Sequence, residues 1–389
     1  MCAAVIILAV LVSCSGPESN SPQDISALAG APKAKNWWGD LVAGIPNNIG
    51  NAITADPATT RTVTWLSTHQ TGELIIGRKH YESESIKHGN YYHHRVNLGD
   101  LAAGTSYQYI AGTPGYYSPV YTFTTAGANS QSGFFVLHIT DPQIGAGGNR
   151  GDAAVWQRVI ESAVKECPEA AFIVNTGDIV EDAIESVIPF YFDYAQKILA
   201  NYAFVYSMGN NDTVNWYNVY FYTPANGSGG KVYSFDYGNA HFINIDSNGA
   251  LTQSQLTWLE NDLKNTAQKW KVVMTHEADY GRSGNNTAVT KLLDKYNVDL
   301  VMAGHNHFYA RSKPIDSAGN AKQNGTVWTI PNTCGTKFND TSGAAYLAVD
   351  KQPKLPMFSV FRFTQANIYL NAYTVDASGS ASLYDTYTW

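Results

Sequence analysis

Polar side chains that could bind metal ions recur between residues 141 and 307, each directly after a short apolar run. The runs span 134–140, 171–176, 204–208, 272–275 and 300–303, and their length and composition are typical of buried strands. In α/β folds, ligands gather at the carboxyl ends of such strands. Carboxylate, amide and imidazole donors together suit divalent cations. We therefore predict a metal centre built from five motifs: Asp141-Pro142-Gln143, Gly177-Asp178, Gly209-Asn210-Asn211-Asp212, Thr275-His276 and Gly304-His305-Asn306-His307.

The order of these motifs resembles that of the calcineurin-like metallophosphoesterases, over about residues 134–350. The stretch after His307, with Tyr309 and Arg311, resembles purple acid phosphatases. The resemblance implies two divalent ions that share Asp178, and Mn, Fe and Zn all remain open as the metal. It implies one site completed by Asp141, Gln143 and His307, and a second completed by Asn210, His276 and His305. Such an ion pair would acidify a water for in-line attack on phosphorus.

Three positions depart from the family pattern. Gln143 replaces a histidine, which should weaken the first site. Glu181 stands where purple acid phosphatases have a ligating tyrosine. It could bind a metal ion, or it could accept a hydrogen bond from a residue that does. Asn211 replaces a histidine that helps to protonate the leaving group, and an amide cannot supply a proton at neutral pH. The loss of a general acid typically costs about 10²–10⁴ in rate. Asp212 could compensate only if its pKa were raised.

The elements around the motifs predict the fold. Residues 36–126 contain short alternating runs separated by Gly, Pro and Asn, which predicts an all-β module that resembles fibronectin type III domains. From 131 to 389, strands alternate with helices, including one that we expect Asp152 to cap. A hairpin is expected around Gly238-Asn239. The predicted fold class is α/β, with a two-sheet α/β/β/α metallophosphoesterase sandwich after the small all-β domain.

The N-terminus carries a targeting signal. The apolar run 3–12 is shorter than the about 20 residues that a membrane-spanning helix needs, but it suits a signal peptide. Leu11-Val12-Ser13-Cys14 resembles a bacterial lipobox, which predicts removal of residues 1–13, lipidation of Cys14 and a flexible linker over 14–35. A signal peptide with an incidental cysteine is the alternative. We expect a membrane lipoprotein on the periplasmic or cell-surface side.

The amino-acid composition of the chain limits the binding partners that we expect. Only 15% of the 389 residues are charged, the net charge is −7, and no basic block occurs, which argues against a nucleic-acid groove. The lipid anchor is then the sole expected membrane contact. Cys167 and Cys334 remain after processing, as two buried thiols or, in an oxidising compartment, a bridge.

We expect hydrolysis of phosphorylated small molecules, with phosphomonoesters favoured. A phosphodiesterase and a non-catalytic metal-binding lipoprotein are the alternatives. The loops 212–232 and 277–290 are expected to supply an aromatic-walled pocket through Trp216, Tyr217, Tyr220, Tyr222, Tyr280 and Arg282.

Overall fold

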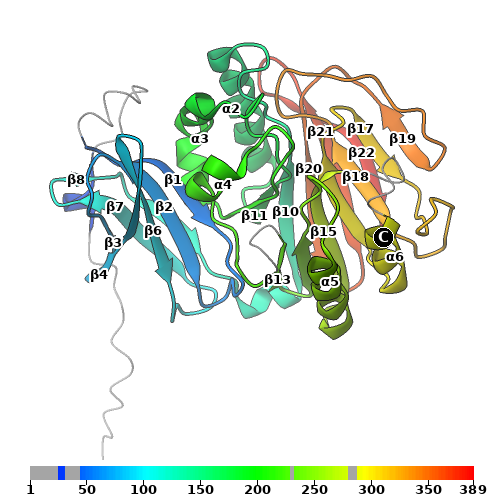
Figure 1. Ribbon diagram of the computed structural model, residues 1–389, viewed down its shortest axis with the longest axis horizontal. Helices are drawn as coiled ribbons and strands as arrows, with labels where there is room; N and C mark the ends of the chain where they lie inside the picture. The colour runs from blue at the N-terminus through cyan, green and yellow to red at the C-terminus, as the bar shows by residue number, and fades with distance from the viewer. Residues whose placement is uncertain (1–24, 31–43, 228–231, 279–286) are drawn as a thin grey trace, which may run out of the picture.

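Two mixed β-sheets face each other in the C-terminal part of the chain (Figure 1). The computed structural model describes residues 25–30, 44–227, 232–278 and 287–389. The first sheet contains the parallel strands β10 (Gly133–Ile139), β11 (Ala170–Asn175) and β12 (Phe204–Tyr206), flanked by the antiparallel strands β20 (Met357–Thr364), β21 (Ile368–Val375) and β22 (Ala381–Thr388). The second runs in the order β13 (Tyr233–Tyr237), β14 (Ala240–Asn244), β15 (Trp270–Glu277), β16 (Leu300–Gly304), β18 (Val327–Pro331), β17 (Tyr309–Ser312) and β19 (Leu347–Lys351).

Helices cover the outer face of each sheet. The longest, α2 (Asn149–Glu166) and α3 (Ile188–Asn201), pack with α4 (Val214–Tyr220) in the apolar cluster on the first sheet, whereas α5 (Gln253–Asn265) and α6 (Thr287–Lys295) pack on the second. Residues alternate between the two faces of each strand. In β10, Phe134 and Val136 therefore face the second sheet and Leu137 faces α2. The predicted α/β/β/α layering is confirmed.

The N-terminal module is all-β, as predicted. Its two sheets enclose a core that includes Val63, Trp65 and Phe123. One sheet holds β1 (Asn47–Ala52), β2 (Arg61–Ser67), β6 (Tyr91–Leu98) and β5 (Glu84–His88), and the other holds β4 (Lys79–Glu82), β3 (Glu73–Ile76), β7 (Ser106–Thr113) and β8 (Tyr116–Tyr117), with β9 (Tyr121–Thr124) paired to β7. Three short 3-10 helices complete the described elements: η1 (Ile25–Ala27), η2 (Ala128–Gln131) and η3 (Glu185–Val187).

This module is not a separate sandwich beside the second domain. β1 pairs in parallel with β12 at Ala52 and Phe204, so the module's first sheet extends the central one to ten strands. The side chain of Gln196 in α3 bonds to both the backbone N–H and the carbonyl of Ile49, at 3.0 and 2.8 Å. Backbone hydrogen bonds across the junction thus bind the module to the layers that carry the motifs.

The structure tests the local predictions for Asp152 and for the two cysteines. The helix that we expected Asp152 to cap begins at Asn149, with Gly148 as its N-cap residue four positions earlier than predicted, so the capping prediction is wrong. The carboxylate of Asp152 instead accepts from the loop before the helix. Cys167 and Cys334 are both buried and free. No described helix is long and apolar enough to cross a membrane, and the expectations for residues 1–24 lie outside the described part of the chain.

Candidate metal centre

The carboxyl ends of β10, β11, β12, β15 and β16 meet at one edge of the paired sheets. Five residues there have positive φ angles: Asp141 (53°), Gln143 (37°), Asp178 (51°), His305 (71°) and His307 (47°). Such a conformation costs a non-glycine residue about 1–3 kcal/mol and tends to cluster at functional sites. The fold holds these five side chains in place at the expense of local backbone strain.

The glycines of the motifs allow the loops to approach one another. A Cβ on Gly209 would lie 2.1 Å from Asp178 Oδ1 and 2.2 Å from Asp178 N. A Cβ on Gly304 would lie 2.0 Å from Thr140 Oγ1. Neither position can hold a side chain without moving the loop beside it. The Gly-Asn and Gly-His pairs therefore have a steric cause.

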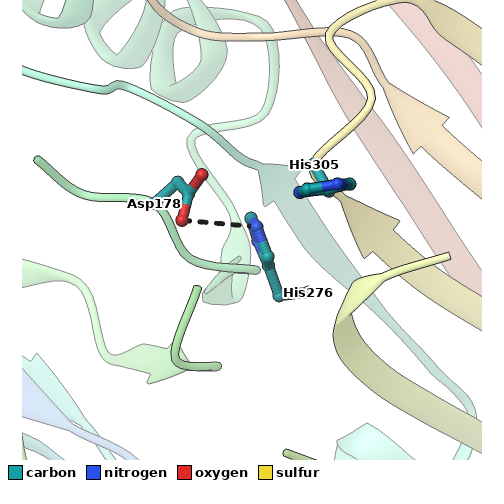
Figure 2. A group of neighbouring side chains, drawn as sticks. All are labelled: Asp178, His276 and His305. Atoms are coloured by element: carbon teal, nitrogen blue, oxygen red, sulfur yellow. Dashed lines mark ion pairs between the residues drawn. The ribbon is translucent and has the colours of Figure 1, made fainter. Parts of the chain in front are cut away.

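One group of donors gathers on the side of the second sheet. Atoms of Asp178, His276 and His305 lie within 4.8 Å of one another, and Figure 2 shows the His276 ring between the other two side chains. His276 Nε2 is 3.3 Å from Asp178 Oδ1. Asn210 Oδ1 lies 3.1 Å from His276 Nε2 and 2.7 Å from His305 Nδ1. Four of the predicted ligands are thus in one place.

A second group adjoins the first through Asp178. Atoms of Asp141, Asp178 and His307 lie within 4.8 Å of one another. His307 Nε2 is 3.2 Å from Asp141 Oδ1, and Gln143 Nε2 donates to Asp178 Oδ2 at 2.9 Å. All seven predicted ligands therefore converge, with Asp178 common to both groups as the sequence analysis expected.

The two buried histidine rings are oriented by backbone carbonyls. His276 Nδ1 lies 2.7 Å from the carbonyl oxygen of Thr176, and His307 Nδ1 lies 3.0 Å from that of Lys337. Donation from Nδ1 leaves the Nε2 lone pair directed at the carboxylates. Metal-binding histidines are commonly held in this way.

The acceptors of the site fit a cation. Gln143 Oε1 is buried and accepts no hydrogen bond among the described residues, and the buried Asp141 Oδ1 has an ion-pair contact with the His307 ring at 3.2 Å. Burial alone would raise the pKa of the Asp178 carboxyl, but His276 and Asn211 outweigh it and hold that pKa well below its ordinary value. Burial lowers the pKa of His276, whereas Asp178 raises it to a net value of about 9. The carboxylates therefore stabilise positive charge here, and the oxygen and imidazole donors fit divalent metal ions.

Asn211 and Asp212 face the same carboxylate from the loop after β12. The backbone and side-chain N–H groups of Asn211 donate to the two oxygens of Asp178, both at 2.7 Å. Asp212 is buried, and its carboxylate accepts from the backbone N–H groups of Gly209, Asp178 and Ile179 at 2.8–3.0 Å. Burial first, and then Asp178, raise the pKa of Asp212 to about 7. Both Asp212 oxygens are thus engaged in joining the two loops.

Glu181 belongs to neither of the two groups of donors. Its carboxylate pairs with Lys337 Nζ, at 2.9 and 3.2 Å. Lys337 is also the residue whose carbonyl orients His307. Sequence reasoning missed Lys337 because a backbone carbonyl has no signature in side-chain type.

Three of the aromatic residues expected to form a pocket wall do not line one. Trp216, Tyr217 and Tyr220 are buried in the core against α3, whereas Tyr280 and Arg282 lie outside the described residues. Arg95 lies over the ring of Tyr222. A cavity of about 830 Å³ does border His305 and Asn306, but residues of β17, β18, β19 and the loops beside them line it.

Comparisons with known proteins agree with this geometry. Residues 135–309 match the family model described as calcineurin-like phosphoesterase. This part of the chain, about 45% of its length, is similar to the calcineurin-like phosphoesterases. The mouse acid phosphatase type 7 is 24% identical over 324 residues, which cover 69% of this chain and 71% of that protein. An uncharacterized protein of Mycobacterium tuberculosis is 29% identical over 163 residues, and the match spans 30% of its length and 34% of this chain.

Solved structures share the fold of nearly the whole chain. A purple acid phosphatase from yellow lupin seeds matches with a TM-score of 0.73 and 16% identity, covering 89% of this chain and 74% of that one. The structure of PhoD matches with a TM-score of 0.64 and 11% identity, covering 92% and 91%. These two similarities concern the fold, whereas the family match and the acid phosphatase relative support a metal-dependent phosphoesterase.

Proposed function

We propose that this protein hydrolyses phosphate monoesters with two divalent metal ions, acting outside the cytoplasm. The observation that carries the proposal is the convergence of six other donor residues around Asp178, together with a buried amide oxygen of Gln143 that accepts no hydrogen bond among the described residues. Asp141, Gln143 and His307 would hold one ion, and Asn210, His276 and His305 the other. When bound, the pair would acidify a water and polarise the phosphoryl group.

The chain's own residues set the geometry for this chemistry. Thr176 and Lys337 hold the histidine rings through their carbonyls, and Asp212 fixes the loop of Asp178 against that of Asn210. We assign Asp212 to positioning, since three backbone N–H groups occupy its oxygens. Asn211, which is not among the proposed ligands, also contacts Asp178, and its side chain can donate a hydrogen bond but not a proton. Leaving-group protonation is therefore the weak step.

That weakness favours esters with acidic leaving groups and makes phosphodiesters the second candidate. A good leaving group departs without a proton from the enzyme, so Asn211 would be tolerated. We expect the metal-loaded protein to cleave 4-nitrophenyl phosphate faster than bis(4-nitrophenyl) phosphate, and the reverse order would favour the diesterase.

The test is turnover of 4-nitrophenyl phosphate after reconstitution with Mn²⁺, Fe²⁺ or Zn²⁺. Asp178→Asn keeps the shape of the side chain but removes the charge shared by both ion positions. It should lower metal content and reduce kcat/KM by more than about 100-fold, since even partners behind the ligands are worth about 10–100-fold. Asp262→Asn, which removes a carboxylate on α5 bonded to Ser234 and His241, is the matched control. Two bound ions without turnover of either ester would favour a non-catalytic metal-binding protein.

The location is proposed from the lipobox-like sequence alone. We expect the mature chain to begin at Cys14 with a lipid on its thiol, and to partition with membranes. Cys14→Ala should move the protein into the soluble fraction while its activity is unchanged. A mature N-terminus at another residue would contradict the lipid anchor without affecting the proposed hydrolysis.

A further inference from the structure

His307 has a strained backbone that its surroundings must hold in place. Its φ angle is 47°, in a region that costs a non-glycine residue about 1–3 kcal/mol and persists only where neighbouring groups fix it. The carbonyl of Lys337 orients the His307 ring through Nδ1, but this contact leaves the His307 backbone free. The groups that bond to the carbonyl oxygen of His307 therefore help to keep the strained conformation.

Two groups from other parts of the chain bond to that carbonyl oxygen. Gln352, directly after β19, donates to it from Nε2 at 2.6 Å, and the backbone N–H of Asn339 donates to it at 3.2 Å. Gln352 Nε2 also donates to the carbonyl oxygen of Asn339 at 2.8 Å. The amide of Gln352 thus ties the His307 backbone to the segment 337–339, which also orients the His307 ring.

The oxygen of the Gln352 amide is occupied as well. Oε1 accepts from the backbone N–H of Lys354 at 2.9 Å and from Asn332 Nδ2 at 3.2 Å. Asn332 is fully buried and has a φ angle of 71°. A neutral amide offers two donors and an acceptor at once, whereas a carboxylate only accepts. The four partners therefore fix one orientation of the amide, with its N–H groups toward His307 and Asn339.

We propose that Gln352 is a positioning residue for one of the two ion positions, and that it acts through His307. The proposal rests on the proposed two-ion hydrolase and adds to it a residue outside the range 135–309 that matches the family model. It predicts that Gln352 affects the ion position that contains Gln143 and His307. The position that contains His276 should not depend on Gln352.

Gln352→Glu tests this directly. The substitution keeps the length of the side chain and the acceptor for Lys354 and Asn332, but it places a second oxygen against two carbonyl oxygens. Equilibrium dialysis against Mn²⁺ with elemental analysis should show one ion bound about 10–100-fold more weakly than in wild type, because partners behind metal ligands are worth that much. The other ion should keep its wild-type affinity. Gln352→Met removes the donors without adding a charge, so it should weaken the same ion by a smaller factor, and it serves as the test if the glutamate variant does not fold.

Gln131 provides a matched control. Its Nε2 donates to the carbonyl oxygen of Gly238 at 2.8 Å, at the edge of the sheet where β10 begins, opposite the metal centre. Gln131→Glu makes the same chemical change beside a backbone carbonyl and should leave both Mn²⁺ affinities unchanged. Wild-type affinity for both ions in Gln352→Glu, or equal weakening of both, would overturn the positioning role.

Turnover of 4-nitrophenyl phosphate separates this proposal from the proposed function. In Gln352→Glu, the Mn²⁺ concentration for half-maximal turnover should rise about tenfold or more, and saturating Mn²⁺ should restore most of the wild-type rate. If dialysis shows the selective loss of one ion while wild type hydrolyses no ester, the positioning role stands and the hydrolase function falls. If wild type hydrolyses the ester and the variant needs no additional Mn²⁺, the function stands and the positioning role falls.

Discussion

Asp152 joins two loops of the metal centre, and its replacement should affect one ion position more than the other. Its side chain is only 1% exposed. One carboxylate oxygen accepts from the backbone N–H groups of Gly145 and Gly147, both at 2.9 Å, and the other accepts from the Thr336 hydroxyl at 2.6 Å. The first loop follows Gln143, and the second precedes Lys337, which orients His307. Both of these ligands belong to the same proposed ion position.

The expected loss of stability can be worked out from these three hydrogen bonds. In Asp152→Asn, the amide oxygen can still accept from the two glycines, and the amide N–H can donate to the Thr336 hydroxyl. Hydrogen bonds to charged groups contribute about 1.5–3 kcal/mol and neutral ones about 0.5–1.5, a difference of about 1–1.5 for each bond, so the substitution should lower the free energy of unfolding by about 3–4.5 kcal/mol. Partners behind metal ligands are worth about 10–100-fold in affinity. We therefore expect one ion to bind about 10–100-fold more weakly.

The assay is metal stoichiometry by elemental analysis after dialysis against a series of free metal concentrations. Wild type should retain two ions over a range in which Asp152→Asn retains one. Asp262→Asn is the control, because it removes a partly buried carboxylate whose partners are distant from the metal centre. It should lower thermal stability without changing the stoichiometry.

Two results would refute this reasoning. If Asp152→Asn is less stable but holds both ions with wild-type affinity, then Asp152 supports the fold and not the ion position. If Asp152→Asn loses both ions together at every metal concentration, separate loops do not hold the two ion positions. Activity alone cannot distinguish these cases, so the stoichiometry decides.

Three further predictions concern the site loops and the fold. Gly209→Ala should lower the free energy of unfolding by about 1–3 kcal/mol and release much of the bound metal, because its Cβ would lie 2.1 Å from Asp178 Oδ1. Gly151→Ala is the control, since its Cβ would lie in open space on α2, and it should raise the free energy of unfolding by up to about 1 kcal/mol. Thermal unfolding together with metal analysis checks both variants. Burial opposes the charging of His241, but its two carboxylate partners raise its pKa to about 9. His241→Gln should therefore lower the free energy of unfolding by at most about 3 kcal/mol. Denaturant unfolding should show the full difference between wild type and variant below about pH 6.5 and a smaller difference as the pH rises to 9. A difference that grows with pH would contradict the assignment. Asn211→His should raise turnover of alkyl phosphates by about 10²-fold and that of aryl phosphates much less, with metal content unchanged; equal effects on both would mean that proton supply is not the deficit.

The ligand types could be predicted from the chain alone because strand ends in an α/β fold have a simple sequence signature. Each apolar run is followed by a polar donor, and parallel strands direct their carboxyl ends to one edge. Gln143, Asp178 and His307 were expected on this basis, and the structure places them together. The layers of the second domain were predictable for the same reason, since each helix has one apolar stripe and each strand two faces.

The tertiary structure alone decided how these donors are held. Asp152 resembles an N-cap in the sequence, yet its carboxylate binds a loop and a hydroxyl 184 residues away. Glu181 occupies the position of a possible ligand, but a lysine from a distant loop neutralises it. The aromatic residues 216, 217 and 220 look like pocket walls in a loop, but they fill the core beside α3. The merging of the two β-sheets through β1 and β12 is likewise a contact between segments about 150 residues apart, and the carbonyls that orient His276 and His307 come from residues 100 and 30 positions away. Local sequence determines which atoms can bind a metal ion, because that depends on side-chain chemistry. Which of them are aligned, neutralised or buried depends on partners that only folding brings near.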